Sequence, residues 1–283
     1  MRNLWMLSLM LLLTLTFAAC ATIVERGTQL PKETVAVGTL DGASVAKSCT
    51  RKLLAAGLLP DLRTVVPQQL QLVNDHQQDM LRFSNGIANT GVGPWWMQPE
   101  FPLSDSSQPQ LAIQQILDAN GKLFCEKIVS QFEFHPAHNH WHINGVALFE
   151  VRVGSPTGPI FGTNSIKTTF CLIDWIKLDD NSPTTDRYFF ECNGAFQGIS
   201  PGWVDQYHQS TDGQQLNITR AAPGLYFLVS TANPDGIFME KDTTNNTAWV
   251  AFTLSRDNNG NPKIELIDHS PCTGGLCGYS PNR

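Results

Sequence analysis

The sequence predicts an all-β fold, a single β-sandwich-like domain with long loops and few short helices. The chain has 22 glycines and 17 prolines among 283 residues, and it has no stretch rich in Glu, Lys, Leu and Ala with helical periodicity. Short segments rich in β-branched and aromatic residues are separated by Gly, Pro and Asn, as expected of strands joined by turns. A chain of this length can form one large domain with a full core.

Five segments have the composition of strands, at residues 80–84, 146–153, 225–230, 248–254 and 263–267. In the second segment the apolar residues at 147, 149, 151 and 153 alternate with Glu150 and Arg152, so one face would pack on a core. We therefore expect the domain to run from about residue 60 to 270, with residues 271–283 as a C-terminal tail.

The charge of the chain disfavours a nucleic acid partner. Lys and Arg number 19 against 25 Asp and Glu, the formal net charge is −6, and only 16% of residues are charged. Binding to phosphates needs a concentration of positive charge that this composition does not supply.

The N-terminus predicts export. Residues 1–19 carry Arg2, an apolar run from residue 4 to 15 and small residues at the end, which is typical of a secretory signal peptide. Residues 17–20 resemble a bacterial lipobox, with Phe17 where leucine is preferred, so Cys20 would anchor the protein to a bacterial membrane or cell surface. The alternative is cleavage near Ala19 or Ala21 and release as a secreted or periplasmic protein. Residues 20–59 would form a tether, with a short helix possible over 45–58.

The six cysteines other than Cys20 are an even set, as expected of disulfides in an oxidising compartment. Six cysteines allow 15 pairings. Pairing nearest neighbours joins Cys171 to Cys192 and Cys272 to Cys277, which leaves Cys49 with Cys125. Metal ligation is the weaker alternative, because no C-x-x-C occurs.

Four histidines lie close together, at His135, His138, His140 and His142. In an extended segment the last three share one face, about 6.6 Å apart per step, and could converge on one ion. Imidazole ligands suit Cu(II), Zn(II) or Ni(II), and copper binds tightest. The alternative is a solvated loop or hydrogen-bonded core histidines. The offset of His135 and the intervening Pro136 predict that His135 faces the other way and at most supports the ligands.

Several segments match the motifs of one family in order. The histidine segment reads H-x-x-H-x-H-x-H after Phe132 and Phe134. The others are P-D-L at 60–62, K-T-T-F-C-L-I-D at 167–174, Q-G-I-S-P-G-W-V-D-Q-Y at 197–207, P-G-L-Y at 223–226 and E-K-D-T-T-N-N at 240–246. Over residues 60 to 255 the chain thus resembles the lysyl oxidase family, with phenylalanines in place of the two tryptophans of its W-x-W-H-x-x-H-x-H-x-H hallmark.

The resemblance implies a copper-dependent amine oxidase. In this family a lysine and a tyrosine form lysine tyrosylquinone, and the matching positions are Lys167 and Tyr207. Copper and O₂ would oxidise the tyrosine ring, and the lysine amine would add to it. The enzyme would convert primary amines, either peptidyl lysine or polyamines, to aldehydes with release of H₂O₂ and ammonia. Asp205 is a candidate proton acceptor, although stabilising the turn after Pro-Gly would explain it equally well.

A second metal site is suggested by oxygen donors. Glu240, Asp242, Asn245 and Asn246 supply carboxylate and amide oxygens within seven residues, which suits calcium. The resemblance implies a structural calcium that also uses Asp61 and the carbonyl of Leu62. The alternative is a polar β-turn.

The chain departs from the animal enzymes at several cysteines. Pro136 and Ala137 stand where those enzymes have a cysteine between the first two histidines, so the disulfide of that loop is absent. Two other functions remain open. An exported copper-binding or matrix-interaction β-sandwich would lack the matured quinone, and a zinc hydrolase would leave the Lys167 and Tyr207 motifs unexplained.

Overall fold

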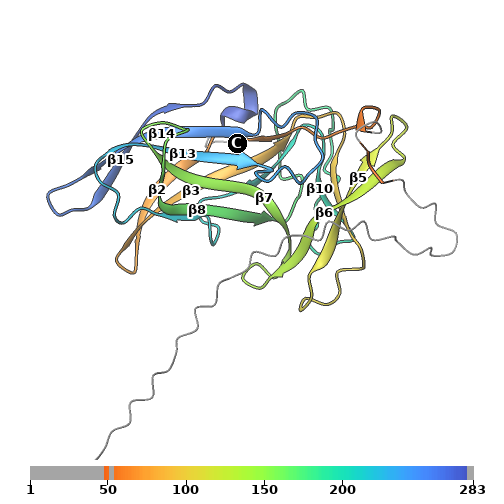
Figure 1. Cartoon of the computed structure of the whole chain (residues 1–283), viewed down its shortest axis with the longest axis horizontal. Coiled ribbons are helices and arrows are strands. Elements are labelled where there is room, and N and C mark those ends of the chain that lie inside the picture. The colour runs from red at the N-terminus through yellow and green to blue at the C-terminus, as the bar shows by residue number, and fades with distance from the viewer. Residues whose placement is uncertain (1–47, 51–53, 279–283) are drawn as a thin grey trace, which may run out of the picture. The chain divides into compact units, whose positions relative to one another are not determined.

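The computed structural model describes residues 48–50 and 54–278, which are built almost entirely from β-strands (Figure 1). The predicted all-β fold is confirmed. Apart from Leu54, the helical residues in these ranges are those of η1, a short 3-10 helix at Gly274–Cys277. Within the same ranges, no helix is long and apolar enough to cross a membrane.

The larger sheet has nine strands in antiparallel pairs. Its order is β10-β4-β5-β6-β7-β13-β14-β15, and β8 pairs with β7 beside this path. The strands are β4 (Trp95–Pro99), β5 (Gln110–Leu117), β6 (Leu123–His135), β7 (His140–Val153), β8 (Ile160–Phe170), β10 (Gln197–Ile199), β13 (Gly224–Ala232), β14 (Thr247–Arg256) and β15 (Pro262–His269).

The smaller sheet has six strands centred on β3. Its order is β1-β3-β11-β9, and β2 and β12 also pair with β3. The strands are β1 (Leu62–Thr64), β2 (Gln68–Asp75), β3 (Gln78–Asn89), β9 (Ile176–Lys177), β11 (Trp203–Tyr207) and β12 (Gln215–Asn217).

The two sheets share one apolar core. Phe83 of β3 meets Phe149 of β7 with ring centroids 4.9 Å apart, and both side chains are fully buried. Across the same interface the hydroxyl oxygens of Thr64 on β1 and Ser230 on β13 lie 2.6 Å apart. Two antiparallel sheets that bury their inner faces against each other form a β-sandwich.

All five predicted strand segments lie within strands, in β3, β7, β13, β14 and β15. The other strands were not predicted. In β2 and β8, two of the longer ones, the apolar alternation is interrupted. β2 is rich in Gln and Asn, and β8 contains Gly162, whose φ of 62° breaks the regular strand conformation. Both pair with a long neighbour, β2 with β3 and β8 with β7. Backbone hydrogen bonds to that neighbour, rather than an alternating side-chain pattern, therefore stabilise these two strands.

The three predicted disulfides are all present, joining Cys49 to Cys125, Cys171 to Cys192 and Cys272 to Cys277. The first connects the segment before β1 to β6, and the second connects the end of β8 to the loop before β10. The pairing of nearest neighbours was therefore correct.

Some described residues outside the expected domain of residues 60–270 also pack on the sheets. Near the N-terminal end, Ser48 bridges Glu126 and Leu58 bridges Leu117, so the described part of the expected tether lies on β5 and β6. At the other end, Leu276 of η1 is buried in the expected tail. The expected signal peptide, Cys20 and residues 45–47 and 51–53 of the expected helix over 45–58 lie outside the described residues. Among the described residues of this helix Leu54 is helical, and the Leu54 N–H donates to the Thr50 carbonyl at 2.9 Å.

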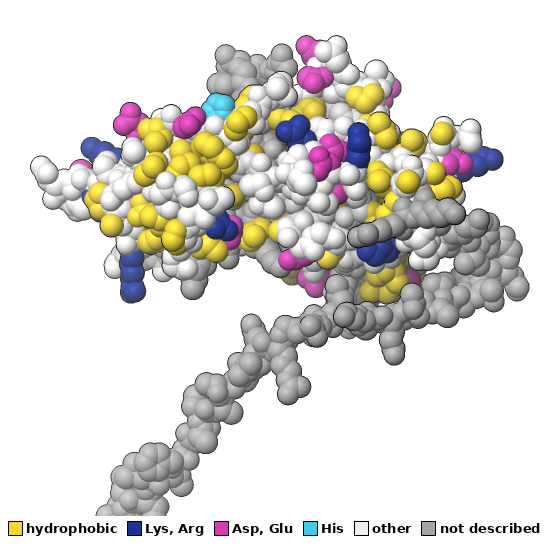
Figure 2. Space-filling model, turned by 45° about the horizontal axis from the view of Figure 1, so that its top comes forward, with side chains coloured by type: hydrophobic (Ala, Val, Ile, Leu, Met, Phe, Trp, Pro, Cys, Tyr) yellow, Lys and Arg dark blue, Asp and Glu magenta, His cyan; other side chains and the backbone are white. Residues whose placement is uncertain are grey.

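Charged side chains on the face shown in Figure 2 are scattered. The Lys and Arg side chains on this face are separated from one another and do not form a stripe. This distribution agrees with the low charge content of the chain.

Candidate metal and cofactor site

The histidines lie on a β-hairpin at one end of the larger sheet. β6 ends at His135 and β7 begins at His140, and these two residues are directly opposite each other in the antiparallel ladder. The turn between them includes Asn139 in a left-handed conformation, with φ of 56°. Because directly opposed residues project to the same face, His135 joins the cluster. The prediction that His135 faces the other way was wrong, because the chain reverses between His135 and His140 instead of continuing as one strand.

The four imidazoles are close to one another. The ring centroid of His138 lies 4.3 Å from that of His135, 5.5 Å from that of His140 and 5.1 Å from that of His142. The rings of His140 and His142 are 4.9 Å apart. One nitrogen from each of His135, His138 and His142 lies within 4.8 Å of the other two. The structure therefore brings together all four predicted metal-site histidines.

The surroundings of His138, His140 and His142 favour their neutral imidazole forms. Burial first, and the charge of the neighbouring histidines second, lower the pKa of His142 to about 3. Burial first, and the charge of neighbouring histidines second, also lower the pKa values of His138 and His140. A neutral imidazole has a free lone pair, which is the form that binds a metal.

Three ring nitrogens in the cluster are buried without a hydrogen-bond partner. They are Nδ1 of His135, Nε2 of His138 and Nε2 of His140. A buried nitrogen without a partner costs roughly 1–3 kcal/mol, so three of them on adjacent rings are poorly explained by core packing. The donor set fits a metal that prefers imidazole, such as copper.

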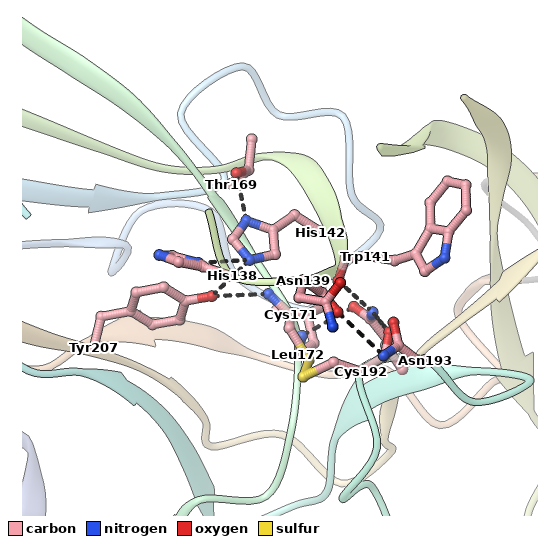
Figure 3. Close-up of a disulfide and its surroundings, with 11 residues drawn as sticks. His138, Asn139, Trp141, His142, Thr169, Cys171, Leu172, Cys192, Asn193 and Tyr207 are labelled. Carbon is pink, nitrogen blue, oxygen red and sulfur yellow. Dashed lines mark hydrogen bonds between the residues drawn. A yellow bond between two sulfur atoms is a disulfide. The ribbon is translucent and has the colours of Figure 1, made fainter. Parts of the chain in front are cut away.

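Tyr207, at the end of β11, points its hydroxyl at this cluster (Figure 3). The backbone N–H of Cys171 donates to the Tyr207 oxygen at 3.0 Å, and Nε2 of His142 lies 3.4 Å from the same oxygen. Phe170 packs against the Tyr207 ring with centroids 4.2 Å apart. Burial first, and the nearby Asp205 second, raise the pKa of the Tyr207 phenol. The phenol therefore stays protonated in the protein.

Lys167 lies on β8, and its backbone is opposite Leu148 of β7. The same strand continues to Thr169, whose Oγ1 is 2.8 Å from Nδ1 of His142, and then to Cys171, which holds Tyr207. β8 and the residue after it thus carry Lys167 and contact both the histidine cluster and the tyrosine.

Asp205 lies two residues before Tyr207 on β11 and is buried, with its Oδ2 atom unpartnered. Burial first, and the charge of Asp174 second, raise the pKa of Asp205 well above its usual range. Asp205 also lines a pocket of about 360 Å³, together with His138, His140, Tyr207 and the half-exposed Trp175. The site is therefore open to a small molecule or an extended side chain.

Gln197 organises the site but was not among the predicted site residues. Gln197 is fully buried, and its Nε2 donates to the carbonyls of Trp141 at 2.7 Å and Cys192 at 2.9 Å. Its Oε1 accepts from the N–H of Leu172 at 3.1 Å. Gln197 thus ties the histidine strand to the disulfide loop. The available signal was its place at the head of the matched Q-G-I-S-P-G segment.

Most of the expected calcium ligands also come together. Asp61 Oδ1 is 3.2 Å from Nδ2 of Asn245, and Oε2 of Glu240 accepts from the N–H of Leu62 at 2.9 Å. Nδ2 of Asn246 donates to Oε1 of Glu240 at 2.8 Å. Burial raises the pKa of Glu240, although the amides of Asn233 and Asn246 oppose the shift.

Asp242 has a local role in the same segment. Its Oδ1 accepts from the Thr244 N–H at 2.8 Å and from the Thr244 hydroxyl at 2.6 Å. Its pKa is lowered by these two hydrogen bonds. The Asp242 side chain therefore stabilises a turn, which is the arrangement expected from the polar β-turn alternative.

Comparison with known proteins points to one family. The lysyl oxidase family model matches residues 113–259, more than half of the chain. Lysyl oxidase homolog 1 of Homo sapiens is 31% identical over 115 residues, which are 41% of this chain and 19% of that protein. Protein-lysine 6-oxidase of Gallus gallus and of Sus scrofa are each 30% identical over 117 residues, covering 26% and 44% of those proteins. The chain thus spans less than half the length of each of these relatives.

The fold and the site define a disulfide-bonded β-sandwich with a histidine cluster beside a partly buried tyrosine. The family match covers the strands that carry this cluster, the lysine and the tyrosine. The chain belongs to the lysyl oxidase family.

Proposed function

We propose that this protein is an exported, copper-dependent amine oxidase. It would convert a primary amine, O₂ and water to an aldehyde, ammonia and H₂O₂. The observation that carries the proposal is the group of imidazoles with buried, unpartnered nitrogens beside the hydroxyl of Tyr207. A family member with this arrangement is better explained as an oxidase than as a structural sandwich.

His138, His140 and His142 would hold the copper, with His135 packed against them. Bound copper would supply the redox chemistry with O₂ that matures a quinone from Lys167 and Tyr207. Within the protein, the Cys171 N–H fixes the position of the Tyr207 oxygen, and Phe170 packs on the Tyr207 ring and limits its movement. These contacts hold the ring in one place, which favours a reaction at a defined position.

Asp205 would accept the proton removed from the substrate carbon. Its unpartnered oxygen and its place in the pocket wall support this role. The raised pKa makes its carboxylate a stronger base than an exposed one. A base acts only when deprotonated, so turnover would rise with pH as Asp205 loses its proton.

The variant Asp205→Asn should mature its cofactor but lower kcat by about 10²–10⁴-fold, because general bases contribute about that much. It should also lose the rise of activity with pH that Asp205 produces. Steady-state kinetics over a pH series measure both effects. The matched control is Asp268→Asn on the exposed strand β15. Wild-type kcat in Asp205→Asn would exclude Asp205 as the base.

The substrate would be a primary amine, either small or on a lysine side chain. The pocket beside Tyr207 can admit an extended amine, and Trp175, which is 55% exposed, supplies an apolar wall at this pocket. The relatives named protein-lysine 6-oxidase support a peptidyl lysine, and the acidic chain supports a polyamine or another cationic substrate.

Amine-dependent release of H₂O₂ tests the function directly. Protein loaded with copper in air should release H₂O₂ and aldehyde with at least one primary amine, and protein kept free of copper should not. Copper-loaded protein that binds the metal but oxidises neither small amines nor lysine peptides would favour the alternative, an exported copper-binding or matrix-interaction sandwich.

We also propose a structural calcium at Asp61, the Leu62 carbonyl, Glu240, Asn245 and Asn246, with Asp242 at its edge. The side-chain oxygens of Asn245 and Asn246 are buried without partners, as expected if they face a cation. Such an ion would connect the start of β1 to the segment before β14, which lie 178 residues apart at the Leu62–Glu240 contact.

Calcium at about 100 times its Kd should stabilise the protein by roughly 2.7 kcal/mol, a rise in Tm of about 5–10 °C for a domain of this size. Differential scanning calorimetry with calcium or with a chelator measures the shift. Glu240→Gln should abolish the calcium effect, and Glu265→Gln on the exposed face of β15 should keep it. A wild-type Tm that ignores calcium would contradict the site.

Export would place the protein in an oxidising compartment, which the three disulfides support. Lipid attachment at Cys20 would hold it at a bacterial membrane or cell surface. Without that modification it would be secreted or periplasmic.

A further inference from the structure

His142 is the most deeply buried imidazole of the cluster, at 2% exposure, and its two nitrogens have different surroundings. Nδ1 lies 2.8 Å from the hydroxyl of Thr169. Nε2 faces the cluster, 3.2 Å from Nδ1 of His138 and 3.4 Å from the Tyr207 oxygen (Figure 3). The protein thus presents one defined nitrogen of this ring to the site.

Only one of the two neutral tautomers leaves that nitrogen able to bind a metal. With the proton on Nδ1, the ring donates to Thr169 Oγ1 and keeps a lone pair on Nε2. With the proton on Nε2, an N–H would point into the cluster and ligation through that atom would be blocked. A threonine hydroxyl can donate or accept, so the other side of the ring selects the tautomer. The protonated Tyr207 hydroxyl, 3.4 Å from Nε2, can donate only to a lone pair on that atom, which leaves the ring proton on Nδ1 for Thr169 Oγ1 to accept.

The backbone alone does not fix the approach of β8 to His142. The ladder between β7 and β8 is irregular between Ile143 and Ala147, and Gly145 in this stretch has a left-handed φ of 76°. The hydrogen bond between His142 and Thr169 lies directly beside this irregular stretch of the ladder. It therefore connects the ring to the strand that carries Lys167 and leads to Cys171, the residue that holds Tyr207.

We propose that Thr169 is a positioning residue that holds His142 as the Nδ1–H tautomer, so that Nε2 faces the metal and Tyr207. This inference rests on the proposed copper site, but it concerns a contact that exists before any metal binds. Partners of this kind on metal-bound histidines typically change metal affinity by about 10–100-fold when removed.

The test compares Thr169→Val, which removes the hydroxyl but keeps the shape, with Thr169→Ser, which keeps a hydroxyl. The matched control is Thr168→Val, because the neighbouring Thr168 hydroxyl is buried without a partner and does not contact the histidines through a hydrogen bond. Two readouts are needed. Nitrogen NMR of the imidazoles reports the tautomer in metal-free protein, and a competing chelator reports the affinity for Cu(II).

We expect metal-free wild type, Thr169→Ser and Thr168→Val to carry the His142 proton on Nδ1, and Thr169→Val to show a mixture of tautomers. The affinity for Cu(II) should fall about 10–100-fold in Thr169→Val alone. An unchanged tautomer in Thr169→Val would overturn the inference. Wild-type protein that binds no copper would instead overturn the proposed function, and the NMR comparison would still decide the role of Thr169.

Discussion

The Tyr207→Phe protein is expected to bind copper but to release no H₂O₂ with any amine. The substitution removes the oxygen that lies 3.4 Å from His142 and that accepts from Cys171, while leaving a ring of nearly the same size against Phe170. Without the phenol, the ring cannot be oxidised to the proposed quinone. Lys167→Ala should abolish normal turnover as well, because it removes the amine that would form the crosslink.

Tandem mass spectrometry of a tryptic digest should find Lys167 and Tyr207 in one crosslinked peptide in copper-loaded wild type and in neither variant. Wild type should also absorb visible light and react with phenylhydrazine. Tyr226→Phe and Lys263→Ala are matched controls, since Tyr226 donates to the Ala222 carbonyl and Lys263 lies on β15, both outside the histidine cluster. Separate, unmodified peptides from protein that still oxidises amines would refute the cofactor.

Copper should be lost from His142→Ala and His138→Ala to below about a tenth of wild-type occupancy, since removing one of three ligands weakens a site strongly. These two histidines belong both to the predicted ligand set and to the set whose nitrogens lie within 4.8 Å of one another. No quinone should form in either variant. Metal analysis after dialysis measures occupancy, and His76→Ala, on an almost fully exposed histidine, is the control.

The third ligand is decided by comparing His140→Ala with His135→Ala. We expect His140→Ala to lose most of its copper and His135→Ala to keep part of it. Wild-type occupancy in His140→Ala would instead assign the third position to His135, whose ring stacks on that of His142 with centroids 4.7 Å apart. Wild-type occupancy in all four variants would remove the copper site from this cluster.

The sequence predicted those features that depend on residues close together along the chain. Strands with regular apolar alternation, such as β7 and β14, were predicted, and so were disulfides between cysteines near in sequence. The orientation of His135 was predicted wrongly because strand periodicity was extended across a turn that reverses the chain. Thr169 and Gln197 were not found, because their roles depend on which strand lies beside them, and their residue types carry no signal of it.

The approach of Asp61 to Asn245 illustrates the same limit. These residues are 184 positions apart, and their contact depends on how β1 and β14 are placed in the sandwich. Only the resemblance to a family suggested that they meet. Spacing along the chain predicts a cluster when one hairpin carries it, and it fails when the members come from separate strands.

The Cys171–Cys192 disulfide connects the segment that contacts Tyr207 to the segment that contacts the histidine turn. Cys171 holds the Tyr207 oxygen, and Asn193, beside Cys192, donates to the carbonyl of Asn139 in the histidine turn at 3.4 Å. In a reducing compartment such as the cytoplasm, this disulfide would not form. Under the proposed function, quinone formation from Lys167 and Tyr207 would follow the formation of this disulfide, and release of H₂O₂ would follow both.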